Sequence, residues 1–121
     1  MNKIWICFMT LLFTYSAAGA APLRVVTSTE DLAAITREVG GPWVTVESLT
    51  RGNQDPHFLE ARPSLILKTA RANLFITVGL GLEAGWAPAL LLGARNPDIQ
   101  PGRSGYIDAS QNISVLELPA G

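Results

Sequence analysis

The sequence predicts an α/β fold in which a parallel four-stranded sheet is flanked by helices. Segments typical of strands alternate along the chain with segments whose apolar residues recur at helical spacing. Residues 74–78 (LFITV) are continuously apolar, as expected for a strand buried on both faces of a parallel sheet. Strands that alternate with helices imply right-handed βαβ units, with the helices covering the sheet.

The first half of the chain contains a strand, a helix and a second strand. Residues 23–28 (LRVVTS) are rich in β-branched residues, and Thr29 offers an N-cap for a helix over residues 30–39 that ends at two glycines. The apolar residues at helical spacing in this helix are Leu32, Ile35 and Val39. Residues 43–49 (WVTVESL) alternate apolar and polar side chains and predict the second strand.

The second half of the chain repeats this alternation. A helix over residues 63–72 begins at a proline, which is tolerated at a first helical position. After the apolar strand, residues 82–94 predict a further helix, in which Pro88 must lie in an early turn or cause a kink. Residues 106–109 predict a fourth short strand, and residues 114–118 are apolar enough to be extended.

The first twenty residues have the layout of a secretory signal peptide. Lys3 precedes an apolar block over residues 4–15, and Ala18-Gly19-Ala20 offers a cleavage site. The alternative is an uncleaved membrane anchor, but a helix of this block would be about 18 Å long, shorter than the roughly 30 Å hydrocarbon core. We therefore expect residues 1–20 to be removed and residues 21–121 to form one domain.

Cysteine content and charge exclude several classes of protein. The single cysteine, Cys7, lies inside the apolar block, upstream of the cleavage site, so the sequence predicts a protein that is not a lipoprotein. Residues 21–121 then contain no cysteine for a disulfide or a thiolate metal site. Nine basic and ten acidic residues give a net charge of −1, so no nucleic-acid partner is expected. We also expect a monomer.

The candidate for chemistry is His57, the only histidine, in a polar segment that follows the second strand. Ligands usually bind at the carboxyl edge of a parallel sheet, and Pro56 stiffens the chain before the imidazole. A neutral imidazole is a good ligand for Zn²⁺. The alternative is a surface or structural histidine, and a zinc site would need further ligands, from Asp55, Glu60 or a region outside this chain.

Other side chains in the sequence have open roles. Glu60 and Arg62 form an ion pair that orients the loop, or they are solvated surface residues. Phe58 packs against the metal site and excludes water, or it belongs to the core. Glu83 and Trp86 are expected to start and anchor the helix over residues 82–94.

Five segments match a pattern of a known protein family. The most specific one is Asp55-Pro56-His57 followed by Glu60 and Pro63-Ser64. The matching segments are LRVVTSTEDL, the Gly-Gly before the second strand, GNQDPHFLEARPS, ARANLFITVGLGLEAGW and GYIDAS. On these segments, residues 23–118 resemble the amino-terminal lobe of the periplasmic solute-binding proteins of zinc and manganese ABC transporters.

The resemblance implies a protein of two α/β lobes joined by a long helix, with the metal held in the cleft between them. His57 matches the ligand that the first lobe supplies, and the resemblance places the other ligands beyond Gly121. Residues 21–121 would then be the first lobe of a larger protein whose second lobe is absent from this chain. The chain ends without a helix that covers its last extended segment, which agrees with this expectation.

Two functions follow from these residues. The first is a periplasmic receptor that captures a divalent transition metal, Zn²⁺ first and Mn²⁺ second, and delivers it to an ABC transporter permease. No bond is made or broken in that function. The alternative is a secreted metal-dependent hydrolase in which His57 binds the metal and Glu60 acts as general base. The helical H-E-x-x-H motif of such hydrolases is absent from the sequence.

Overall fold

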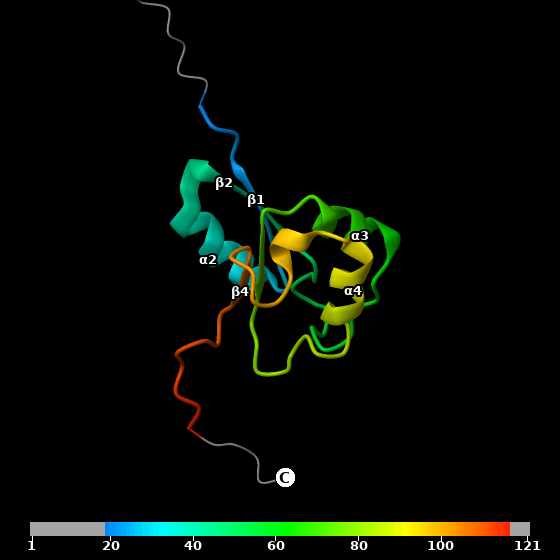
Figure 1. Ribbon diagram of the computed structural model, residues 1–121. Helices are drawn as coiled ribbons and strands as arrows, with labels where there is room; N and C mark the ends of the chain where they lie inside the picture. The colour runs from blue at the N-terminus through cyan, green and yellow to red at the C-terminus, as the bar shows by residue number, and fades with distance from the viewer. Residues whose placement is uncertain (1–18, 117–121) are drawn as a thin grey trace, which may run out of the picture.

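In the computed structural model, which describes residues 19–116, four parallel strands form one sheet in the order β2-β1-β3-β4 (Figure 1). The strands are β1 (Leu23–Thr27), β2 (Val44–Ser48), β3 (Leu74–Thr77) and β4 (Tyr106–Asp108). The helices are α2 (Glu30–Gly40), α3 (Pro63–Ala70) and α4 (Ala87–Ala94), with the short 3₁₀ helices η1 (Gly41–Trp43) and η2 (Pro97–Ile99). The predicted fold class is confirmed.

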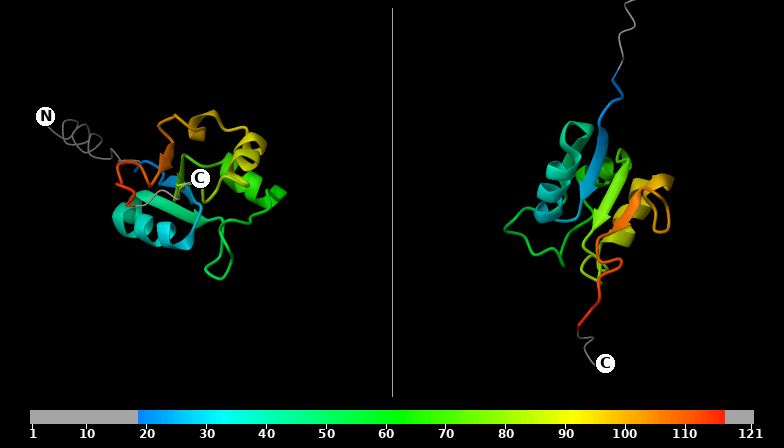
Figure 2. Two further views of the ribbon diagram at one scale, coloured as in Figure 1. Left: turned by 90° about the horizontal axis from the view of Figure 1, so that it is seen from below. Right: turned by 90° about the vertical axis from the view of Figure 1, so that its left-hand side faces the viewer.

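The helices cover the two faces of the sheet unequally. Helix α2 lies on one face, and α3 and α4 lie together on the other (Figures 1 and 2). All neighbouring strands are parallel, so their carboxyl ends meet at one edge of the sheet. The loops that follow β1, β2 and β3 leave from this edge, where parallel sheets usually bind their ligands.

Strand β1 is one of the two inner strands of the sheet, and it pairs with β2 and β3. Val26 pairs with Glu47 of β2 on one side and with Phe75 of β3 on the other. The backbone pairing continues past the end of β1, because the Ser28 N–H donates to the Ile76 carbonyl at 2.9 Å. The carboxyl ends of β1 and β3 are therefore held together.

Helix α2 begins and ends where the sequence predicts, but two of the apolar residues that the sequence places on its buried face, Ile35 and Val39, are exposed. The Thr29 hydroxyl accepts from the Leu32 N–H at 3.4 Å, which caps the helix. Ala33 is buried, whereas Ile35 is 61% exposed and Val39 is 83% exposed. The reason is that α2 lies over β1 and β2 and leaves an open apolar groove toward β3.

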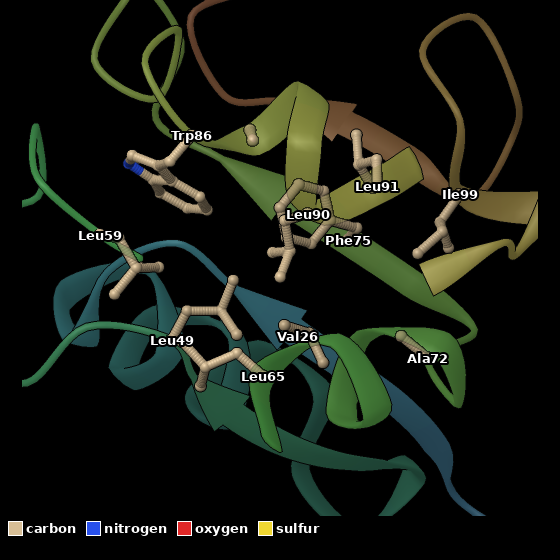
Figure 3. Packing of buried hydrophobic residues seen from close by; sticks show 11 residues of the cluster. Val26, Leu49, Leu59, Leu65, Ala72, Phe75, Trp86, Leu90, Leu91 and Ile99 are labelled. Atoms are coloured by element: carbon tan, nitrogen blue, oxygen red, sulfur yellow. The ribbon is translucent and has the colours of Figure 1, made fainter. Parts of the chain in front are cut away.

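The core lies between the sheet and the pair α3 and α4 (Figure 3). Phe75 of β3, Leu90 of α4 and Ile99 of η2 have no exposed surface. The buried cluster consists of Val26, Leu49, Leu59, Leu65, Ala72, Phe75, Trp86, Ala87, Leu90, Leu91 and Ile99. The burial of this apolar surface is the main term that stabilises the fold.

The helix predicted over residues 82–94 is shorter than expected. Helix α4 begins at Ala87, with Pro88 in its first turn as predicted. The preceding residues form successive turns, such as the one closed by the hydrogen bond from the Leu82 N–H to the Gly79 carbonyl at 3.2 Å. They do so because the side chain of Glu83 bonds to the ends of β1 and β3, which holds this segment against the sheet edge.

Several sequence predictions concern the ends of the chain. Residues 114–116 do not join the sheet, so the predicted extended segment over residues 114–118 is not a strand in the part that is described. The predicted signal peptide lies outside the described residues except for residues 19–20, and so does Cys7. Within residues 19–116, no helix has both the length and the apolar character that a membrane crossing requires.

Candidate metal-binding site

The site predicted from the sequence lies on the loop that joins the carboxyl end of β2 to α3, over residues 49–62. Figure 2 shows this loop, in green, projecting from the body of the molecule. The side chain of His57 is 60% exposed on it. The imidazole therefore stands at the carboxyl edge of the sheet, as predicted, and it is open to a ligand from solvent or from another part of the protein.

Asp55 fixes the orientation of His57. Its Oδ1 atom accepts from the backbone N–H of His57 at 3.0 Å and lies 2.7 Å from the ring atom Nδ1. The hydrogen bond from the backbone N–H of His57, followed by the bond to the ring, lowers the pKa of Asp55 below its ordinary value of 3.8. The carboxylate is therefore ionised at neutral pH and acts only as an acceptor.

The protonation pattern of the imidazole follows from this contact. An ionised carboxylate has no hydrogen to give, so Nδ1 of His57 must carry one toward Asp55. In the neutral ring, the lone pair then remains on Nε2. Metal-binding histidines commonly donate their other ring N–H to a carboxylate in this way, which fixes the orientation of the ring. The pair is thus arranged as a metal ligand with its supporting group.

The loop around the imidazole is tied to the fold at two places. The Pro56 carbonyl accepts a hydrogen bond from Nε1 of Trp86 at 2.8 Å. Leu59, two residues after the imidazole, is buried in the core cluster. Between them, the Phe58 N–H donates to the Asp55 carbonyl at 3.1 Å and closes a turn around His57. The exposed imidazole is therefore held on a defined backbone.

The other predicted residues of the loop lie at the surface. Phe58 is 81% exposed, with its ring centre 6.3 Å from that of His57, so it does not belong to the core. Glu60 and Arg62 are both exposed, and the hydrogen bond between them joins the Arg62 N–H to the Glu60 carbonyl at 2.8 Å. They are solvated surface residues, which is one of the two roles considered for them.

The described residues do not contain a complete metal site. Among residues 19–116, no group of three or more histidine, cysteine, aspartate or glutamate side chains is placed to hold a metal ion. Asp55 is already bonded to His57 and supports the ring. Zinc normally takes four ligands, so a tight site at His57 requires donors from outside the described residues.

Sequence reasoning missed the role of Glu83. Its side chain is buried, with Oε1 accepting from the Ser28 hydroxyl at 2.6 Å and from the Val78 N–H at 2.7 Å. Oε2 accepts from the Gly79 N–H at 3.1 Å. The carboxylate thus joins the ends of β1 and β3 and does not start a helix. The sequence pattern that could have indicated turns instead of a helix here is the Gly-x-Gly of residues 79–81, which precedes Glu83.

The chain matches a family of metal-transport components. Residues 25–118 match the family described as zinc-uptake complex component A, periplasmic (ZnuA). The manganese ABC transporter substrate-binding lipoprotein PsaA of Streptococcus pneumoniae is 31% identical over 122 residues, covering 92% of this chain and 38% of that protein. The metal ABC transporter substrate-binding lipoprotein FimA of Streptococcus parasanguinis is 31% identical over 121 residues, with the same two coverages.

A solved structure has the same fold. The crystal structure of ZnuA matches with a TM-score of 0.64 and 25% sequence identity, over 80% of this chain and 35% of that one. The chain thus spans 38% of the length of the two curated relatives and 35% of that structure. The family match over residues 25–118 includes the loop that carries His57 and the helices α2, α3 and α4.

Proposed function

Because this chain belongs to the ZnuA family of periplasmic metal-binding ABC transporter receptors, we propose that it forms the amino-terminal lobe of a receptor for a divalent transition metal. Residues 21–121 are this lobe, and His57 is its ligand to the metal. The observation that carries the proposal is the bond from Nδ1 of His57 to Asp55, which leaves Nε2 as the ring nitrogen available to a metal on an exposed side chain at the carboxyl edge of the sheet. The second lobe supplies the remaining ligands.

Zinc is the first choice of metal, and manganese is the second. An imidazole nitrogen is a common ligand of zinc, whereas manganese favours sites rich in carboxylate oxygens. The name of the matching family refers to zinc, and PsaA is named for manganese. The choice depends on how many carboxylates the remaining ligands include.

The proposed receptor works outside the cytoplasm. Residues 1–20 have the layout of a signal peptide that directs export to the periplasm. PsaA and FimA are named lipoproteins, which conflicts with the expectation that this chain is not one. That expectation rested on the position of Cys7, which lies among the residues that the structure does not describe.

The partner of the receptor is an ABC transporter permease, to which it delivers the captured ion. Members of the family are solute-binding receptors of transporters and not enzymes, so the hydrolase alternative is abandoned. In agreement, Glu60, the general base of that alternative, is an exposed residue of the loop. Binding and release of the ion are the whole of the proposed chemistry.

The proposal predicts that Asp55→Asn weakens metal binding by about 10–100-fold, the usual effect of removing a group that supports a ligand. The amide is neutral and can also present its NH₂ group to the ring, so it no longer fixes the hydrogen on Nδ1. The measurement is a titration of the full-length receptor with Zn²⁺ and with Mn²⁺ against a competing chelator.

The matched control is Asp31→Asn, which makes the same change at an exposed residue in the first turn of α2 rather than in the loop. This variant should bind both metals as the unchanged receptor does. If Asp55→Asn binds Zn²⁺ with the affinity of the control, the Asp55–His57 pair is not part of the metal site. If neither metal binds to the unchanged receptor, the proposed function is wrong.

A further inference from the structure

The segment between β3 and α4 lies directly against the His57 loop. Trp86 is 3% exposed, and its indole Nε1 donates to the Pro56 carbonyl, the peptide group immediately before His57, at 2.8 Å. A side chain at Gly85 would meet the His57 carbonyl, because a Cβ atom there would lie 3.6 Å from its oxygen, so the backbone of this segment passes close to the loop. The two contacts fall on consecutive peptide groups on either side of His57.

Trp86 is itself held by Glu83, three residues earlier. The three hydrogen bonds to the carboxylate come from Ser28 at the end of β1 and from Val78 and Gly79 at the end of β3. The backbone N–H of Trp86 donates to the backbone carbonyl of Glu83 at 3.1 Å, which closes the turn between them. A buried carboxylate with all three donors in place fixes its surroundings, because breaking any of these bonds leaves an unpaired polar group.

These contacts make a continuous path from the sheet to the imidazole. It runs from the strand ends through Glu83 and the indole ring of Trp86 to the Pro56 carbonyl, and then to the turn in which Asp55 holds His57. Figure 3 shows the indole of Trp86 above Leu59, at the end of the core nearest to the loop. The ring is thus packed among core residues and directs its single polar atom out to the loop.

We propose that Trp86 is a positioning residue for the metal site, and that Glu83 holds it in place. This inference rests on the proposed role of His57. In the metal-free protein, the indole N–H holds the loop in the conformation in which Nε2 can bind the metal. Without that bond, the loop is free to move about Pro56, and part of the binding free energy is used to order it. Trp86 does not touch the metal.

The test is Trp86→Phe in the full-length receptor, because phenylalanine keeps an aromatic ring in the core and removes the N–H. Loss of the single hydrogen bond from Trp86 to the Pro56 carbonyl is expected to lower the Zn²⁺ affinity of this variant by roughly two- to tenfold. The affinity is measured against a competing chelator. In parallel, NMR follows hydrogen exchange of the His57 backbone N–H, which should become faster when the loop is released, with no metal present.

Two variants separate positioning from general stability. Ile99→Val also trims the core, at the end of the cluster away from Trp86 in Figure 3, and should leave both the affinity and the exchange rate unchanged. Trp43→Phe makes the same substitution at a residue that is 69% exposed and should also change neither. If Ile99→Val lowers the affinity as much as Trp86→Phe does, the effect comes from stability and the inference is wrong.

The variant His57→Ala distinguishes failure of the inference from failure of the proposed function. If His57→Ala loses Zn²⁺ binding while Trp86→Phe keeps the affinity of the unchanged receptor, Trp86 has no positioning role and the function stands. If His57→Ala binds Zn²⁺ normally, both fail. Loss of affinity in both variants, with faster exchange at the His57 N–H in Trp86→Phe, supports the inference.

Discussion

Replacing His57 by alanine is expected to lower the affinity of the full-length receptor for Zn²⁺ by more than about 100-fold. Removal of a group that merely supports a ligand costs roughly 10–100-fold, and His57 is proposed to bind the metal directly. No neighbouring side chain can take its place, because it is the only histidine of the chain and the described residues contain no cluster of three or more metal-ligating side chains.

The structure also predicts what this substitution leaves unchanged. The side chain of His57 is 60% exposed, and the turn around it is closed by backbone atoms of Asp55 and Phe58. Exposed substitutions of this kind have little effect on stability. His57→Ala should therefore keep the thermal unfolding midpoint of the unchanged receptor while losing the metal. Equal Zn²⁺ affinities under a competing chelator would falsify the ligand assignment.

The sequence predicted the strands well because each strand is encoded locally. Residues 74–78 form a run that is apolar except for Thr77, and β3 lies within it at Leu74–Thr77, between β1 and β4 in the sheet. The alternation in residues 43–49 likewise contains β2, with only its first and last residues outside the strand. Patterns of this kind reflect burial on one or both faces, which the sequence itself displays.

The start of α4 and the exposure of α2 could not be predicted, because both depend on distant parts of the chain. The side chain of Glu83 accepts a hydrogen bond from Ser28, 55 residues earlier in the chain, and Glu83 lies in the turns before α4 instead of in the helix. The apolar residues Ile35 and Val39 have the spacing of a buried face, but α2 lies where it does not bury them. A helical pattern indicates which residues share a face, and only the tertiary arrangement determines what that face meets.

The candidate site likewise combines a contact that the local sequence predicts with a contact that depends on the tertiary fold. The contact of Asp55 with His57 spans two residues, and the proline between them restricts the chain to a turn, so the motif itself encodes the pair. The bond from Trp86 to Pro56 spans 30 residues and has no local signal. His57 could thus be proposed as a metal ligand from the sequence, whereas the hydrogen bond from Trp86 that supports its loop could be found only in the three-dimensional structure.

The second large effect concerns the core, and Phe75→Ala is expected to destabilise the fold by about 3–5 kcal/mol. Phe75 has no exposed surface and lies on β3, facing α3 and α4 at the centre of the buried cluster (Figure 3). Its ring centre is 6.0 Å from that of Tyr106, a contact that alanine cannot make. The neighbouring backbone is held by sheet hydrogen bonds and cannot close over the cavity.

The matched control is Phe58→Ala, the same change at a ring that is 81% exposed, which should alter stability by no more than about 0.5 kcal/mol. A further variant, Phe75→Leu, keeps most of the buried volume and should cost less than Phe75→Ala. Urea denaturation followed by far-UV circular dichroism measures all three. Native domains are stable by only about 5–15 kcal/mol, so Phe75→Ala should shift the midpoint strongly. Equal midpoints for the two alanine variants would contradict the placement of the core between the sheet and α3 and α4.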